Sequence, residues 1–475
     1  MATKTTEEMM AELESSIKPY KKDYHTYSHL PATGRKKETI IGELEALKAA
    51  EESKWKNGLV SGAVYHGAQD HIDFLNEVYA LTSQTNPLHT DVWPSITKFE
   101  AEVISMTANM MSAEKVNDVE DADDEVCGAL SSGGTESILL AMKTYRDWAR
   151  EMKGIRNPEM IVPSTAHAAF DKASQYFNIK MKRIPVDENF KADIEKTRDA
   201  ITPNTIVIVG STPSFPHGVI DPIEALSELA REEDIGFHTD ACLGGFILPW
   251  AEKLGYEVPL FDFRLPGVTS ISVDTHKYGY AAKGSSIILY RNPELRRYQF
   301  YTTTDWPGGL YLSPTFAGSR SGALSAAAWA AMLSIGEEGY LANTKKILEA
   351  AAVIKDGIRD IPELYLLGDA LWDIAFSSKD LNIYKVMDYM GEKKWSLNGL
   401  QNPAAVHICL TLRHAQEGLP EKFITDLKSA VESTINNPGK AVDGAGRLYG
   451  MSANIPIKGV VDAFLKRFLD LLFKL

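Results

Sequence analysis

The sequence predicts an α/β protein with a large domain built on a mostly parallel sheet and a smaller α+β domain after it. Across residues 96–340, short apolar runs such as 205–209 and 286–290 alternate with helical stretches such as 223–233. Alternation of this kind is typical of a parallel sheet covered by helices. After an alanine-rich helical segment at residues 323–333, the order changes to a helix, two strand-like runs and another helix. That change predicts the smaller domain.

The chain divides into three parts on this interpretation. Residues 1–95 begin polar and helical, with an apolar period over residues 39–50, and become rich in glycine and aromatic side chains from residue 58. We expect an N-terminal arm here and not a separate domain. The large domain is predicted at residues 96–340 and the small C-terminal domain at residues 341–475.

Composition favours a globular protein of a reducing compartment. The chain has 475 residues, of which 44% are hydrophobic and 24% are charged, which is ordinary for a folded protein. Its three cysteines, Cys127, Cys242 and Cys409, are scattered, so neither a disulfide framework nor a metal site is expected. Residues 1–16 lack the apolar core of a secretory signal. We therefore expect a cytoplasmic location.

Charge and hydropathy exclude two further classes of partner. A net charge of -14 argues against nucleic acid, because such binding depends on Lys and Arg that neutralise phosphates. Residues 459–475 have one apolar helical face but five charged residues, so they are too polar to span a bilayer. A terminal helix packed on the protein is expected, with a peripheral membrane helix as the alternative. The acidic run at residues 120–125 lacks the spacing of a calcium loop.

Two local motifs in the first half of the large domain fit a cofactor site. The turn Gly133-Gly134-Thr135 lies between an apolar run, residues 126–130, and a helical run, residues 138–150. Glycines before a helix let free N–H groups and the positive end of the helix converge on a phosphate. Taken alone, the turn also fits an ordinary strand-to-helix connection. His167, which stands between small residues, fits either a core histidine or a ring stacked on an aromatic cofactor.

Two later motifs place an aspartate and a lysine at predicted strand ends. Asp240 follows residues 235–238, and His276-Lys277 follows residues 271–273. Open α/β sheets bind their ligands at such ends. A lysine that forms an imine with pyridoxal phosphate needs a fixed position, and the ring nitrogen needs a buried carboxylate. Either residue alone also fits a capping or solvated side chain, but the order of all four motifs predicts a pyridoxal phosphate site.

The same motifs resemble the fold-type I pyridoxal phosphate enzymes of the group II decarboxylase superfamily. Within it, the chain is similar to the sphingosine-1-phosphate lyase family in three segments: residues 86–94, 238–246 and 313–320. Amino-acid decarboxylases usually have a hydrophobic residue where Thr239 stands and Ala-Trp or a similar pair after the aspartate, whereas Cys242 stands here. The resemblance implies the fold-type I transferase architecture, with a mostly parallel sheet of the seven-stranded type in the large domain.

The resemblance also implies roles for single residues. Lys277 would bind the cofactor covalently, Asp240 would pair with the ring nitrogen, and His167 would stack on the ring. Ser211 would border the hydroxyl side of the ring. The cofactor phosphate would rest on residues of one subunit and on two that its partner supplies: Gly134, Thr135 and His276, with Gly318 and Ser319 across the interface of a homodimer.

The implied reaction is retro-aldol cleavage of a phosphorylated long-chain base, such as sphingosine 1-phosphate, to a fatty aldehyde and phosphoethanolamine. A separate polar set would bind the substrate phosphate: Tyr65, Asn86, His89 and Lys283. On the residues alone, Lys283 equally fits a turn lysine and Tyr65 a core aromatic. The acceptor of the C3 hydroxyl proton stays open between a phosphate oxygen, a histidine and Lys277.

Two other functions are alternatives to the lyase hypothesis, and the chain differs from the eukaryotic members of the family in one respect. An amino-acid decarboxylase of the glutamate or aromatic type would bind a carboxylate near the cofactor and would need no second phosphate anchor. A scaffold without catalysis is disfavoured because both Asp240 and Lys277 are present. Eukaryotic members of the family carry an N-terminal transmembrane helix, and no transmembrane segment is predicted here, so the chain is more similar to the soluble prokaryotic forms.

Overall fold

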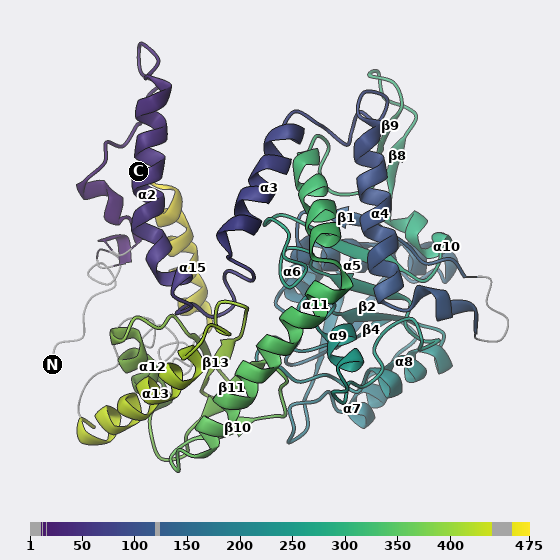
Figure 1. The fold of residues 1–475 in the computed structure, drawn as a ribbon. Helices are drawn as coiled ribbons and strands as arrows, with labels where there is room; N and C mark the ends of the chain where they lie inside the picture. Colours follow the sequence, from purple (N-terminus) through teal and green to yellow (C-terminus); the bar gives the residue numbers. More distant parts are fainter. Residues whose placement is uncertain (1–10, 12, 16, 119–123, 439–457) are drawn as a thin grey trace.

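The computed structural model describes residues 11, 13–15, 17–118, 124–438 and 458–475. Figure 1 shows two groups of elements, one around a large sheet and one around a small sheet, joined by a long helix. Residues 120–123 of the acidic run lie outside the described residues.

The large sheet has seven strands in the order β1-β7-β6-β5-β4-β2-β3. The strands β1 to β6 are mutually parallel across the sheet, and β7 runs antiparallel to both of its neighbours, β1 and β6. This confirms the mostly parallel sheet. Their bounds are β1 (Cys127–Ser131), β2 (Glu159–Pro163), β3 (Lys180–Ile184), β4 (Thr205–Ser211), β5 (Gly236–Asp240), β6 (Ser270–Val273) and β7 (Ser286–Tyr290).

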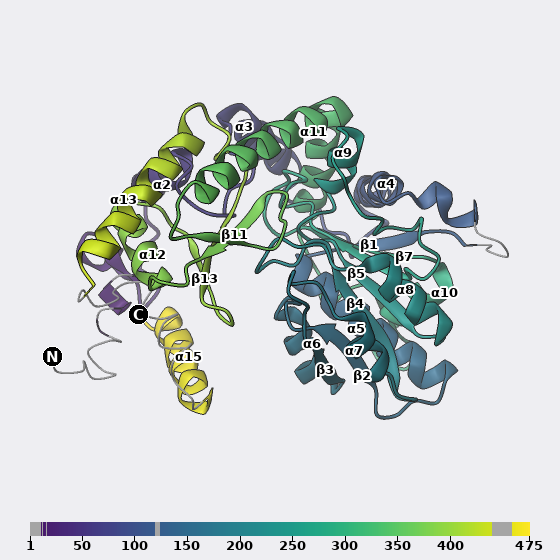
Figure 2. The same cartoon turned by 90° about the horizontal axis from the view of Figure 1, so that it is seen from below.

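Helices cover both faces of this sheet, which explains why most of its strands are continuous apolar runs. A Cβ at Gly236 would meet the ring of Tyr145 on α5, whereas a Cβ at Gly210 would meet Ile223 on α8. Gly210 pairs with Thr239 on β5 and shares its face of the sheet. Side chains alternate between the two faces along a strand, so Thr239 and Gly236 face opposite sides. Helices α5 and α8 therefore lie on opposite faces of the sheet (Figure 2). The helices of this part are α4 (Pro94–Met110), α5 (Gly134–Met152), α6 (Ala169–Phe177), α7 (Ile194–Asp199), α8 (Ile223–Glu232), α9 (Leu248–Lys253) and α10 (Pro293–Arg296), with short 3-10 turns η2 (Ala113–Asp118) and η3 (Arg297–Gln299).

The C-terminal part has a four-stranded antiparallel sheet in the order β10-β11-β13-β12. Its elements are β10 (Tyr365–Leu367), β11 (Asp373–Ser377), α12 (Ile383–Glu392), β12 (Asn398–Leu400), β13 (Ala405–Cys409) and α13 (Leu419–Asn436). The smaller α+β unit is therefore confirmed. It is joined to the large sheet by α11 (Gly322–Arg359), which bends at Gly336, where φ is 63°. The division of the chain into residues 1–95, 96–340 and 341–475 stays a prediction. The predicted division between residues 340 and 341 falls inside α11.

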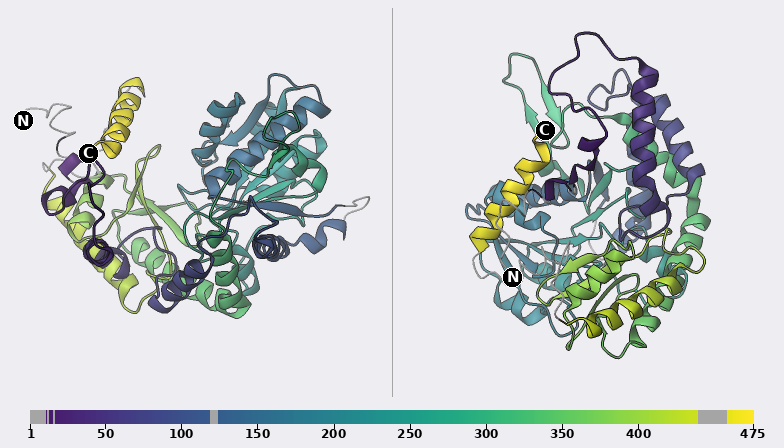
Figure 3. Two further views of the ribbon diagram at one scale, coloured as in Figure 1. Left: turned by 90° about the horizontal axis from the view of Figure 1, so that it is seen from above. Right: turned by 90° about the vertical axis from the view of Figure 1, so that its left-hand side faces the viewer.

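The two chain ends and a hairpin complete the fold. The N-terminal residues form η1 (Pro19–Lys22), α2 (Lys37–Lys56) and α3 (Gln69–Thr82), and a hairpin of β8 (Tyr301–Thr303) and β9 (Tyr311–Ser313) projects from the large part (Figures 1 and 3). The predicted terminal helix is α15 (Lys458–Phe473). It buries Leu471 but leaves Leu465 and Leu469 half exposed. Within the described ranges, no helix is long and apolar enough to cross a membrane.

Candidate active site

A cavity of about 460 Å³ opens where β4, β5 and β6 end and α5 begins. Parallel neighbouring strands end at the same edge of a sheet, so residues far apart in the sequence meet there. The cavity lining brings together these predicted site residues: Tyr65, Gly134, Thr135, His167, Ser211, Asp240, His276 and Lys277.

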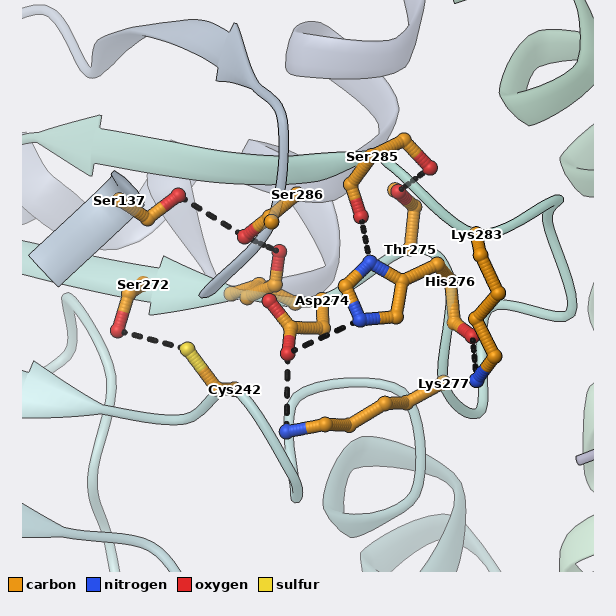
Figure 4. Close-up of polar contacts among 12 residues, drawn as sticks. Ser137, Cys242, Ser272, Asp274, Thr275, His276, Lys277, Lys283, Ser285 and Ser286 are labelled. Atoms are coloured by element: carbon orange, nitrogen blue, oxygen red, sulfur yellow. Dashed lines mark hydrogen bonds and ion pairs between the residues drawn. The ribbon is translucent and has the colours of Figure 1, made fainter. Parts of the chain in front are cut away.

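Lys277 lies in the turn that follows β6 and forms an ion pair inside the cavity. Its Nζ is 2.9 Å from Oδ2 of Asp274, whose side chain is buried (Figure 4). Burial alone would lower the pKa of Lys277, but the charge of Asp274 outweighs it and raises that pKa above its ordinary value. Burial would likewise raise the pKa of Asp274, yet Lys277 and His276 hold it below the usual range. The amine is therefore charged and held in one place.

Asp240 is the last residue of β5 and is fixed by two donors. The backbone N–H of Cys242 and the hydroxyl of Ser272 donate to its Oδ1 at 3.1 and 3.3 Å. Behind them, His238 contacts Ser272 Oγ at 3.2 Å. Burial lowers the pKa of His238 to about 4, so this histidine is neutral near pH 7. A carboxylate oriented in this way can hold a proton on a ring nitrogen.

The turn before α5 forms a close-fitting cradle. A Cβ at Gly134 would lie 2.7 Å from both carboxylate oxygens of Asp274 and 2.8 Å from Cys242 Sγ. Ser137 Oγ lies 2.7 Å from Ser131 Oγ and 2.9 Å from Ser286 Oγ, and these hydrogen bonds join the helix start to β1 and β7. The first N–H groups of α5 have no partner within the helix, so they favour an anion at this position.

Glu136 is a cavity residue that the sequence analysis did not single out. Its Oε2 accepts from the N–H of Ser132 at 2.6 Å, and its Oε1 accepts from the N–H of Phe316 at 3.1 Å. It therefore ties the cradle to the segment after β9. The only local signal was its position in the first turn of the helix, where an acidic side chain can cap backbone N–H groups. Asp274 was also missed, although it stands three residues before Lys277 in the same motif.

Lys283 lies beside the cavity and not in its lining. Its Nζ is 3.3 Å from the carbonyl oxygen of His276 and 4.4 Å from the ring centroid of Tyr65, which does line the cavity. Desolvation of the amine and the charge of Lys277 lower the pKa of Lys283 to about 8. Lys283 is thus a second basic side chain near the cavity of Lys277, and it contacts the ring of Tyr65, which lines that cavity.

The remaining predicted residues gather elsewhere on the same chain. In the described part of the chain, the cavity lining does not include Asn86, His89, Gly318 or Ser319. The Oδ1 atom of Asn86 accepts from the N–H of Arg320 at 3.3 Å, so the turn that carries Asn86 and His89 lies next to the Gly318-Ser319 segment. The four residues form one surface outside this chain's own cavity.

The chain matches a known family and individual relatives over most of its length. Residues 22–377 match the pyridoxal-dependent decarboxylase conserved domain. The sphingosine-1-phosphate lyase of Arabidopsis thaliana is 49% identical over 90% of this chain and 79% of its own, and that of Saccharomyces cerevisiae is 42% identical over 94% and 76%. The solved sphingosine-1-phosphate lyase of Burkholderia pseudomallei has a TM-score of 0.90 at 43% identity and covers 96% of this chain and 99% of its own.

The chain belongs to the sphingosine-1-phosphate lyase family. The glutamate decarboxylase of Lactobacillus brevis has a TM-score of 0.73 at 18% identity over 87% of this chain and 96% of its own, which shows a shared fold alone. This lyase-family chain is therefore a pyridoxal-dependent carbon–carbon lyase, and the predicted fold-type I architecture is confirmed.

The residues around the cavity fit pyridoxal 5'-phosphate. Lys277 offers an amine for the aldehyde of the cofactor, and Asp240 offers a carboxylate for its ring nitrogen. Only glycine at position 134 lets the start of α5, with its free N–H groups, lie this close to Asp274 and Cys242. Ser211 Oγ is buried and has no hydrogen-bond partner among the described residues, so it is available to the ring hydroxyl.

The cradle generates a direct prediction about cofactor binding. Gly134→Ala places a methyl group against Asp274 and Cys242, so the start of α5 must move away from the anion position. We expect cofactor affinity to fall by about tenfold or more, corresponding to about 1.4 kcal/mol or more, measured by fluorescence titration of the cofactor-free protein. Gly42→Ala, at an open position in α2, is the control and leaves affinity unchanged. Equal affinity for both variants would contradict the cradle assignment.

Proposed function

We propose that this chain cleaves a phosphorylated long-chain base, such as sphingosine 1-phosphate, by a retro-aldol reaction to a fatty aldehyde and phosphoethanolamine. The observation that carries the proposal is the second cation, Lys283, which stands beside a cavity that already holds the charged amine of Lys277. The phosphate of such a substrate fits Lys283, and its amine can take the place of Lys277 on the cofactor. The names of its relatives support the same substrate class.

Each cavity residue has a proposed part in the cleavage. When bound, the cofactor supplies a conjugated ring that takes up the electron pair released as the C2–C3 bond breaks. Asp240 keeps the proton on the ring nitrogen, and His167 holds the ring by stacking on it. The C3 hydroxyl gives up its proton as the aldehyde forms, and the acceptor is a phosphate oxygen, a histidine or Lys277. Lys277, whose Nζ lies beside Asp274, then returns a proton to the carbon from which the aldehyde has left.

The substrate phosphate is proposed to bind at Lys283 and Tyr65. An ammonium group serves as a point charge for phosphate, and a tyrosine hydroxyl adds orientation. Because Tyr65 lines the cavity and its ring lies 4.4 Å from Lys283 Nζ, a phosphate bound by both residues would lie at the edge of the cofactor cavity.

We further propose a homodimer with shared active sites. Asn86 and His89 lie beside the Gly318-Ser319 segment and outside this chain's own cavity. In a twofold dimer, one such surface can face the cavity of the other subunit. Gly318 and Ser319 would then complete the partner's cradle, while Asn86 and His89 would complete its substrate phosphate site.

A cytoplasmic location is proposed from the cysteines. Cys127, Cys242 and Cys409 are free and buried. Free thiols of this kind fit a reducing compartment.

The test of the function is a product assay on the purified holoenzyme. With sphinganine 1-phosphate, we expect stoichiometric phosphoethanolamine and fatty aldehyde, and borohydride reduction should leave the cofactor attached to Lys277 in the mass spectrum. Lys277→Arg should lower kcat by about 10³-fold or more, because a general acid and a covalent anchor are both lost. Release of carbon dioxide from glutamate or aromatic amino acids, without aldehyde from the phosphorylated base, would instead establish the decarboxylase alternative.

The pKa of Lys283 predicts the pH dependence of substrate binding. Lys283 carries its charge below pH 8 and loses it as the pH rises through about 8, whereas the substrate phosphate stays dianionic. KM should therefore rise above pH 8, and Lys283→Gln should raise KM by about 10- to 100-fold at pH 7, the value of a charged hydrogen bond. Lys283→Arg should remove the rise with pH, since arginine stays charged.

A matched control for Lys283 lies on α6. Lys172 also stands over a tyrosine ring, at 5.3 Å from the centroid of Tyr176, but it does not line the cavity. Lys172→Gln should leave KM unchanged at every pH. A pH-independent KM in the wild type would contradict the role given to Lys283.

A further inference from the structure

One wall of the cofactor cavity is a loop, here called the wall loop (residues 212–220), which runs from β4 to α8. Its residues Pro213 and Phe215 line the cavity. At its start, the N–H of Thr212 donates to the carbonyl oxygen of Asp240 at 2.8 Å. The loop is therefore attached directly to the strand end that carries the carboxylate of the cofactor site.

The far end of the wall loop rests on the four-stranded sheet. Gly218 has a φ of +65°, and a Cβ there would lie 2.0 Å from the carbonyl oxygen of Asp373 on β11. Ser214 and His217 are buried, but among the described residues their side chains make no hydrogen bond. The tip is held instead by the stacking of His217 on Phe190, with centroids 4.1 Å apart, and by backbone bonds such as that from Ser214 N–H to the Val219 carbonyl.

His407 on β13 contacts the wall loop at two further points. Its Nδ1 lies 3.2 Å from the carbonyl oxygen of Pro216, and because a carbonyl only accepts, Nδ1 carries a proton and donates. The same ring meets Phe215 edge to face, with centroids 4.6 Å apart and planes at 80°. His407 itself is fully buried, whereas Phe215 is 41% exposed. Phe215 therefore packs on a buried, ordered partner that belongs to the small sheet.

Asp373 supports this arrangement from the neighbouring strand. Its Oδ1 is 3.7 Å from Nδ1 of His407, and both side chains are buried. The separation is too long for a good hydrogen bond, but the negative charge favours the tautomer that carries its proton on Nδ1.

We infer that His407 is a positioning residue for the cofactor cavity: by bonding Pro216 and packing on Phe215, it holds the wall loop against the bound cofactor. The position of the bound cofactor then depends on the small sheet as well as on the large one. Figures 2 and 3 show that these two sheets lie in separate parts of the molecule. The inference rests on the proposed function only through the cofactor that fills the cavity.

Two substitutions separate the two contacts of His407. His407→Asn keeps a donor at the position of Nδ1 and loses the ring, whereas His407→Phe keeps a ring and loses the donor. In the holoenzyme, we expect His407→Phe to release cofactor about two- to tenfold faster, the value of one hydrogen bond, and to weaken the visible circular dichroism band of the bound cofactor. His407→Asn should restore at least half of the lost band.

The control is another buried histidine of the same part of the chain. His414 accepts at Nδ1 from the N–H of Thr411 at 2.9 Å and does not line the cavity. His414→Phe should lower the unfolding temperature while leaving the cofactor band and release rate unchanged. Equal cofactor effects for His407→Phe and His414→Phe would overturn the inference, because they would reflect general loss of stability.

A second route tests the same contact from the loop. Phe215→Leu should also weaken the band, and adding it to His407→Phe should change the release rate by less than the product of the two single effects, because both act on one contact. Independent, multiplicative effects would overturn the inference. Failure of the wild type to cleave the phosphorylated base would remove the proposed function and leave these cofactor signals measurable, so the two failures are distinguishable.

Discussion

The buried ion pair between Lys277 and Asp274 is the interaction on which the site depends. The two atoms are 2.9 Å apart in a place where Asp274 is almost fully shielded from water. Removing one partner of a buried pair costs about 3–5 kcal/mol, because the other charge stays behind unpaired. The neighbours of Asp274 are adapted to it: Gly134 lacks a side chain where one would strike the carboxylate. The pair therefore sets the position of the amine and the shape of the cradle together.

The sheet topology turns these local contacts into a site. The parallel strands β4, β5 and β6 end side by side and bring Ser211, Asp240 and the turn of Lys277 to one edge. Strand β7 returns antiparallel along β6, and the carbonyl oxygen of Ser285 before it lies 2.5 Å from Nδ1 of His276. This contact orients the histidine next to the lysine. The same edge also receives the wall loop, through which the small sheet reaches the cavity.

Much of this arrangement could be predicted from the sequence because strand ends in an α/β fold converge. Alternating apolar runs predicted the sheet, and Asp240 and Lys277 then had to lie near each other. The position of four other predicted site residues could not be predicted in this way: Asn86, His89, Gly318 and Ser319. Their motifs indicate a function but not which subunit's cavity they serve, and the structure places them outside this chain's own. His407 and Glu136 were missed because their partners are distant or lie in the backbone, and a histidine in a strand has the pattern of any core residue.

We propose that the site accepts two phosphates, one from the cofactor in the cavity and one from the substrate beside it. A crystal structure of the holoenzyme with phosphoethanolamine tests it most directly. We expect the cofactor phosphate at the start of α5 and the ligand phosphate within hydrogen-bond distance of Lys283 Nζ and the hydroxyl of Tyr65. A ligand bound with its phosphate away from both residues would contradict it.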